Sequence, residues 1–130
     1  MGRGRLSLII AGTVFLALAL PSCGFKRKLV SITMIPDKTT LAGTGVELQF
    51  KAIGNYQHPP DSRDITTSVT WESVAPQIVT VDQTGLAISQ NGCGTNITIT
   101  ATGHSDPHDS SSGLVVGTAA VNVTQPGICP

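Results

Sequence analysis

Apolar side chains recur at every second position over most of the chain beyond residue 28. The clearest run is 46–52, in which apolar residues at the even positions alternate with charged or amide residues, and 97–101 and 119–123 repeat the pattern. Successive side chains of a β-strand point to opposite faces, so this period indicates strands with one buried face. The alternation therefore predicts antiparallel sheets and argues against a helical fold.

About seven such strands are expected, and turn signals such as 82–85 separate them at intervals of eight to twelve residues. The expected strands are 29–35, 46–52, 69–71, 79–81, 86–88, 97–101 and 119–123. They predict an all-β fold, an antiparallel sandwich of two sheets closed around the single tryptophan, Trp71, as core anchor. An open barrel is the alternative. The pattern leaves the strand order open.

The first 22 residues have the layout of an export signal. Arg3 and Arg5 precede an apolar run, 6–20. As a helix these fifteen residues reach roughly 22 Å, which is short of the ~30 Å hydrocarbon core of a bilayer. The length is typical of a secretory signal peptide. A short transmembrane anchor and a buried helix are the alternatives.

The end of this segment, Leu-Pro-Ser-Cys at 20–23, resembles the bacterial lipobox. The resemblance implies that 1–22 are removed, that Cys23 carries lipid, and that 23–28 form a lipidated tether to the membrane. The residue after Cys23 is Gly24 and not an aspartate, as in lipoproteins that are sorted to the outer membrane. The sequence leaves open whether the domain would face the periplasm or the cell exterior. The basic residues at 26–28 either rest on anionic headgroups or form a solvated tether.

Lipidation of Cys23 has a consequence for the other two cysteines. Cys93 and Cys129 then remain as one pair in an oxidising compartment. A disulfide between them closes a loop of about 36 residues and is worth roughly 3–4 kcal/mol on the chain-entropy estimate. Two free thiols are the alternative, and the bridge is the prediction.

The charge balance argues against nucleic acid as a partner. Only 12% of residues are charged and the formal net charge is +0. Beyond Lys28 the chain has three basic and eight acidic residues, a net charge of about −5. A mildly acidic body repels a phosphate backbone at long range.

Several segments, in order and spacing, resemble the bacterial immunoglobulin-like group 2 family. They are 32–36, 40–41, 46–50, 64–66, 69–73, 78–82, 85–87 and 94–101. The resemblance implies one immunoglobulin-like domain over 29–125, a C-terminal tail at 126–130, and cell-surface adhesion through carbohydrate or protein contacts. The sequence departs from the family pattern at two places, at Cys93 in the turn before Thr95 and in the long loop 103–113.

The residue types that carry chemistry are few. No G-x-S-x-G motif is present, and His58 stands beside two prolines, so we expect no enzyme, no catalytic residue, no cofactor and no small-molecule substrate. His104 and His108 share a polar loop with Asp106 and Asp109, which suggests a small periplasmic protein that binds Zn²⁺ or Cu²⁺ as the alternative function. A loop rich in Ser, Gly and Pro holds ligands poorly, and no metal site is predicted.

These patterns together predict a non-catalytic, lipid-anchored lipoprotein of the cell envelope, at the outer membrane. It would act as an adhesion, binding or spacer domain, with surface carbohydrate or another envelope protein as its partner. That function follows from family resemblance, because one fold hosts many functions. Contacts are expected at unpaired strand edges and in the loops 54–64 and 103–113.

Overall fold

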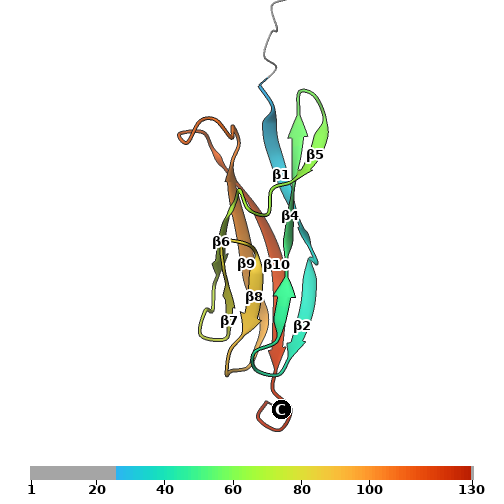
Figure 1. Cartoon of the computed structure of the whole chain (residues 1–130), viewed down its shortest axis with the longest axis vertical. Coiled ribbons are helices and arrows are strands. Elements are labelled where there is room, and N and C mark those ends of the chain that lie inside the picture. Colours follow the sequence, from blue (N-terminus) through green and yellow to red (C-terminus); the bar gives the residue numbers. More distant parts are fainter. Residues whose placement is uncertain (1–25, 130) are drawn as a thin grey trace, which may run out of the picture.

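The computed structural model describes residues 26–129 and shows an elongated all-β molecule (Figure 1). The strands are β1 Lys28–Ile35, β2 Lys38–Ala42, β3 Glu47–Gln49, β4 Lys51–Gln57, β5 Asp61–Asp64, β6 Thr70–Ser73, β7 Val79–Val81, β8 Leu86–Ser89, β9 Gly94–His104 and β10 Leu114–Thr124. Between residues 26 and 129 there is no helix with the length and apolarity needed to cross a membrane.

The strands form three sheets with the orders β1-β4-β5, β2-β10-β9-β6 and β3-β8-β7. The four-stranded sheet makes one layer. The two three-stranded sheets make the opposite layer, and the continuous segment β3–β4 joins them end to end. The predicted all-β sandwich is confirmed.

The strand count differs from the prediction, because residues 26–129 form ten strands where about seven were expected. The run 46–52 is two strands that belong to different sheets: β3 pairs with β8, and β4 pairs with β1. Between them Phe50 leaves the ladder, and its N–H donates to the carbonyl of Gly85 at 2.8 Å. Alternation continues through such a break and therefore does not reveal it. Strands β2 and β5 have too little apolar alternation to be predicted.

One pair of strands is parallel, which the antiparallel prediction missed. β2 runs parallel to β10, with Thr39 opposite Val121 and Leu41 opposite Val123. The segment from β1 to β2 passes from one layer to the other at Pro36-Asp37 without reversing direction, so β2 meets the far sheet in the parallel sense. The Ala120 N–H donates to the carbonyl of Asp37 at 2.9 Å, where the pairing begins.

A local irregularity changes which side chains of β1 are buried. Period two alone places Val30 on the same face as Ile32 and Met34, yet Val30 is 41% exposed while the other two are buried. The pairing of β1 with β4 shifts register between Leu29 and Ser31, so Leu29 enters the core in place of Val30. An extra residue of this kind is a β-bulge, which re-aims the side chains on one side of it.

Trp71 lies in the core between the layers and is 3% exposed. Its ring packs against Phe50, with ring centroids 6.3 Å apart, and its Nε1–H donates to the carbonyl of Thr66 at 2.7 Å. The indole therefore has its one polar group satisfied inside an apolar environment. Gly85, in the turn before β8, packs directly against this pair. A Cβ at Gly85 would lie 2.9 Å from Trp71 Cζ2 and 2.9 Å from the Phe50 carbonyl oxygen.

Gly85→Ala tests this contact, and Gly45→Ala is its matched control. Both glycines have a left-handed φ, +80° and +73°, but a Cβ at Gly45 would meet nothing within 4 Å. We expect Gly45→Ala to lower the free energy of unfolding by about 1 kcal/mol through backbone strain alone. Gly85→Ala adds the clash and should lose about 2–4 kcal/mol. Urea unfolding measures both; equal losses would contradict the close packing on Trp71.

Asp82 supplies a pH-dependent contribution to stability in the β7–β8 turn. Hydrogen bonds from the Thr84 hydroxyl, the Leu86 N–H and the Thr84 N–H hold the pKa of Asp82 below its ordinary 3.8. A lowered pKa in the folded state means stability that is complete above the unfolded-state pKa and is lost as pH falls through the folded one. We expect the urea midpoint to fall between about pH 5 and pH 2, with a smaller fall for Asp82→Asn. The exposed Asp37 provides the control Asp37→Asn, which should retain the wild-type fall.

Candidate functional site

The chain enters and leaves the described part of the molecule at opposite ends of its long axis (Figure 1). The N-terminal end is formed by residues 26–28, the β4–β5 turn at 58–60 and the β9–β10 loop at 105–113. The C-terminal end is formed by the β8–β9 turn and residues 125–129. These two ends hold the candidate site residues.

Both loops expected to make contacts lie at the N-terminal end. Residues 54–64 are largely the β4–β5 hairpin, so the predicted loop is reduced to the turn 58–60. The other loop begins at 105, because β9 continues to His104. Strand pairing therefore brings together two segments that are distant in sequence.

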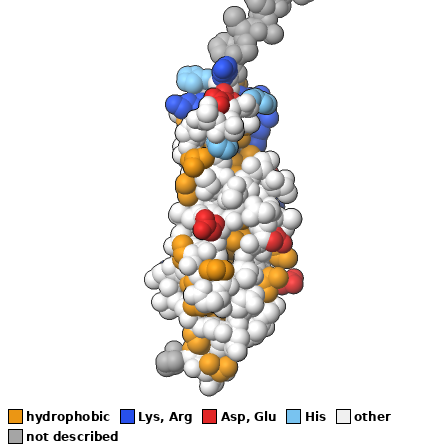
Figure 2. Space-filling view, turned by 90° about the vertical axis from the view of Figure 1, so that its left-hand side faces the viewer, with side chains coloured by type: hydrophobic (Ala, Val, Ile, Leu, Met, Phe, Trp, Pro, Cys, Tyr) orange, Lys and Arg blue, Asp and Glu red, His pale blue; other side chains and the backbone are white. Residues whose placement is uncertain are grey.

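Charged side chains gather at this end, as Figure 2 shows for one face. Within residues 26–129 it carries four of the six lysines and arginines and all three histidines. The four basic residues are Lys26, Arg27, Lys28 and Arg63; the histidines are His58, His104 and His108. Four aspartates accompany them, so the two signs are balanced.

An open hollow of about 850 Å³ lies among these groups. Its lining residues are Lys26, Arg27, Tyr56, Arg63, Asp64, Ile65, Asp106, Pro107, His108 and Asp109. They come from the residues before β1, from the β4–β5 hairpin with its following residue, and from the β9–β10 loop. Hence three chain segments build one concave surface.

Two guanidinium groups share one carboxylate at the hollow. Arg63 Nε lies 2.7 Å from Asp61 Oδ2, and Arg27 Nη1 lies 3.7 Å from the same oxygen. A guanidinium carries five N–H donors in a rigid fork, so each arginine retains donors beyond its contact with Asp61. Asp61 thus positions two cations and satisfies only part of their bonding capacity.

The aspartates of the β9–β10 loop order the loop itself. Asp106 accepts the N–H of His108 at 2.9 Å, and Asp109 accepts the N–H of Ser111 at 2.9 Å and its hydroxyl at 2.6 Å. The Ser111 bonds lower the pKa of Asp109, with smaller contributions from the positive charge of Lys26 and from His104. Both carboxylates are therefore engaged within the loop.

The residues of the metal-binding alternative lie at this loop. His104, the last residue of β9, and His108, within the loop, are both exposed. Within residues 26–129, no three His, Cys, Asp or Glu side chains gather closely enough to hold a metal ion. The geometry supplies no ligand set for that alternative.

Burial affects one further group in the hollow. Tyr56 is half-buried on β4, and loss of solvent raises the pKa of its hydroxyl, with Arg27 opposing the rise and Asp61 adding to it. Its phenol remains protonated well above neutral pH and is available as a hydrogen-bond donor.

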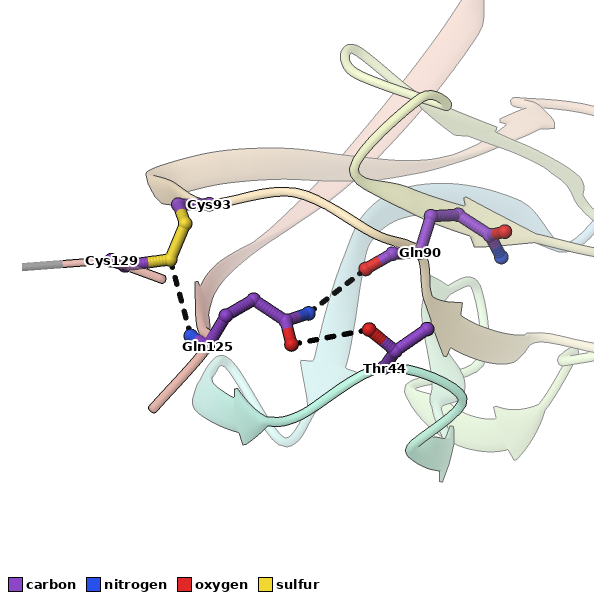
Figure 3. Close-up of a disulfide and its surroundings, with 5 residues drawn as sticks. All are labelled: Thr44, Gln90, Cys93, Gln125 and Cys129. Atoms are coloured by element: carbon purple, nitrogen blue, oxygen red, sulfur yellow. Dashed lines mark hydrogen bonds between the residues drawn. A yellow bond between two sulfur atoms is a disulfide. The ribbon is translucent and has the colours of Figure 1, made fainter. Parts of the chain in front are cut away.

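A disulfide joins Cys93 to Cys129 at the C-terminal end, with the Cα atoms 6.0 Å apart (Figure 3). It ties the turn before β9 to residues 125–129, which form a turn. Cys23, the predicted lipidation residue, lies outside the described residues.

Buried Gln125 links three segments beside the disulfide (Figure 3). Its Nε2–H donates to the carbonyl of Gln90 at 3.1 Å, its Oε1 accepts from Thr44 Oγ1 at 3.1 Å, and its backbone N–H donates to Cys129 Sγ at 3.2 Å. Gln125 is not among the residues predicted from the sequence. A signal was present, because Gln125 continues the alternation of Val121 and Val123 onto the core face.

No known protein-family model matches the chain, and no curated protein matches it either. The resemblance to the bacterial immunoglobulin-like group 2 family therefore stays a prediction from sequence.

Replacing both cysteines, Cys93→Ser with Cys129→Ser, tests the contribution of the bridge. We expect the free energy of unfolding to fall by about 3–4 kcal/mol, because the unfolded chain regains the freedom of a 36-residue loop. Urea unfolding of the oxidised, reduced and double-variant proteins measures this. The reduced wild type should match the variant. A loss below about 1 kcal/mol would contradict a stabilising bridge.

Proposed function

We propose that this protein is a non-catalytic lipoprotein of the cell envelope, anchored through lipid on Cys23, whose immunoglobulin-like domain acts as a spacer. The observation that carries the proposal is the position of the two ends of the described chain. Residue 26 lies at one end of an elongated sandwich and residue 129 at the other (Figure 1). A domain with this layout separates whatever adjoins its C-terminal end from the membrane.

The dimensions of the sandwich suit a spacer. Strands β9 and β10 have eleven residues each and run along the long axis (Figure 1). At about 3.3 Å per residue, eleven residues span roughly 36 Å. The C-terminal end is held by the disulfide and by the buried amide of Gln125, so it is the more strongly cross-linked of the two ends.

The connection to the anchor is short. Only Gly24 and Phe25 separate Cys23 from Lys26. Three residues of fully extended chain reach about 11 Å at most. With lipid on Cys23, the N-terminal end of the sandwich must therefore lie at the membrane surface, and the C-terminal end projects away from it.

The character of the hollow supports a role without catalysis. Its lining contains no serine, threonine or cysteine that His108 would activate as a nucleophile. The core between the layers is filled by apolar side chains such as Phe50, Ile99 and Val121. Action through surfaces, as in binding or spacing, fits this arrangement.

Cys23→Ser tests the anchor. We expect the wild-type protein to float with membranes, to sediment with outer-membrane density, and to show the mass of a chain that starts at Cys23 with a diacylglyceryl group and an acylated amino terminus. Cys23→Ser should lose the lipid mass and the processed form. Flotation and intact mass spectrometry measure both properties.

The double variant Cys93→Ser with Cys129→Ser is the matched control, because it removes two cysteines without touching the anchor, and it should float like the wild type. A wild-type mass without lipid, or cleavage at another position, would contradict the proposal.

A further inference from the structure

We propose that the hollow at the N-terminal end binds the phosphate of an anionic phospholipid headgroup through the guanidinium groups of Arg27 and Arg63. The inference rests on the proposed anchoring at Cys23, which holds this end of the domain at the membrane. It adds a specific lipid contact to what would otherwise be a passive attachment.

The arginine pair has the chemistry that a phosphate requires. Asp61 Oδ2 contacts both side chains, at 2.7 Å from Arg63 Nε and 3.7 Å from Arg27 Nη1. One carboxylate oxygen cannot satisfy two guanidinium forks, and the N–H groups left over are suited to bidentate bonds with phosphate oxygens. Because the shared partner restrains both side chains, less rotamer freedom is lost on binding.

Other lining groups complete a site of suitable size and polarity. The hollow, at about 850 Å³, falls in the range of ordinary ligand sites. Lys26 adds a third positive charge, and the protonated hydroxyl of Tyr56 adds a neutral donor. Exposed Pro107 offers apolar surface to a glycerol backbone.

The carboxylates in the hollow keep their negative charge, but they are already bonded to donors of the protein. Asp64 accepts bonds from the N–H and hydroxyl of Thr66, which lower its pKa. Asp106 and Asp109 accept bonds within their own loop. Because their bonds go to their own segments, these three carboxylates do not occupy the N–H groups of the two arginines, which remain available to an anion.

The rest of the surface favours the same orientation. Away from the N-terminal end, the described residues carry two basic groups against four acidic ones. The basic pair is Lys38 and Lys51; the acids are Asp37, Glu47, Glu72 and Asp82. An anionic bilayer repels that surface, whereas the balanced N-terminal end with its arginine pair approaches it.

Proximity makes even a weak site effective. The tether allows at most about 11 Å between Cys23 and Lys26, which is close to the Debye length of about 8 Å at physiological ionic strength. Binding to a headgroup is then effectively intramolecular with respect to the membrane, so the local concentration of ligand is high.

The test uses the processed, lipid-bearing protein in vesicles of phosphatidylcholine alone and of phosphatidylcholine mixed with phosphatidylglycerol. Flotation first establishes that the protein is anchored in both. Thermal unfolding followed by circular dichroism then measures the headgroup contact, because a ligand that binds only the folded state raises Tm. We expect Tm to be roughly 5 °C higher in the vesicles that contain phosphatidylglycerol.

The variant Arg27→Lys with Arg63→Lys separates a phosphate site from diffuse attraction. It keeps both charges and removes both guanidinium forks, so a specific site predicts that most of the Tm difference disappears. The matched control, Lys38→Gln with Lys51→Gln, removes two cations outside the hollow and should keep the full difference. Full retention in the arginine variant would overturn the site in favour of a diffuse field.

Three other outcomes also overturn the inference. An anchored wild type with equal Tm in both vesicles removes the site and leaves the anchor standing. A wild type that fails to float removes both proposals. A rise of the same size with inorganic phosphate added to phosphatidylcholine vesicles shows a site for free phosphate and not for a lipid headgroup.

Discussion

The contact of Trp71 with Phe50 and Gly85 is the point at which the three sheets meet. Trp71 belongs to the four-stranded layer, Phe50 stands at the break between the two sheets of the opposite layer, and Gly85 precedes β8. A single close-packed cluster therefore fixes the separation of the layers and the place where the segment 47–57 changes sheets. Interiors packed at crystalline density transmit a displacement at such a point to every strand that adjoins it. The ordered ends of the molecule, with their charged hollow and their disulfide, depend on strands that this cluster holds in place.

Much of the fold was predictable because burial has a period. The strands around Ile99 and Val121 bury the alternate residues that the sequence indicated. What alternation does not show is where one ladder ends and another begins, since Phe50 stays in phase with its neighbours while it changes partners. Alternation also hides local exceptions. One additional residue near Val30 reverses which side chains of β1 face the core. The parallel pairing of β2 depends on a crossing between layers, which the hydropathy pattern does not show.

The candidate site was predictable only in part, for a related reason. The two loops singled out from sequence do lie at one end, but the arginine pair joins residues 36 positions apart in the chain, and no local pattern couples Arg27 to Arg63. Strand pairing between β1, β4 and β5 creates that proximity. The buried amide of Gln125 is different, because it follows the phase of β10 and was open to prediction as a polar residue on an apolar face.

The loop closed by Cys93 and Cys129 has a mechanical consequence. A force that pulls residue 129 away from the N-terminal end of the molecule enters the domain through the disulfide at Cys93, just before β9, and bypasses everything between the two cysteines. Strands β9 and β10 both lie within that loop, so they cannot be drawn out as extended chain while the bridge holds. About 120 Å of contour length, at roughly 3.4 Å per residue, is thereby withheld from stretching. Under tension the segment between the two cysteines keeps its length, and any yielding is confined to the strands that precede Cys93.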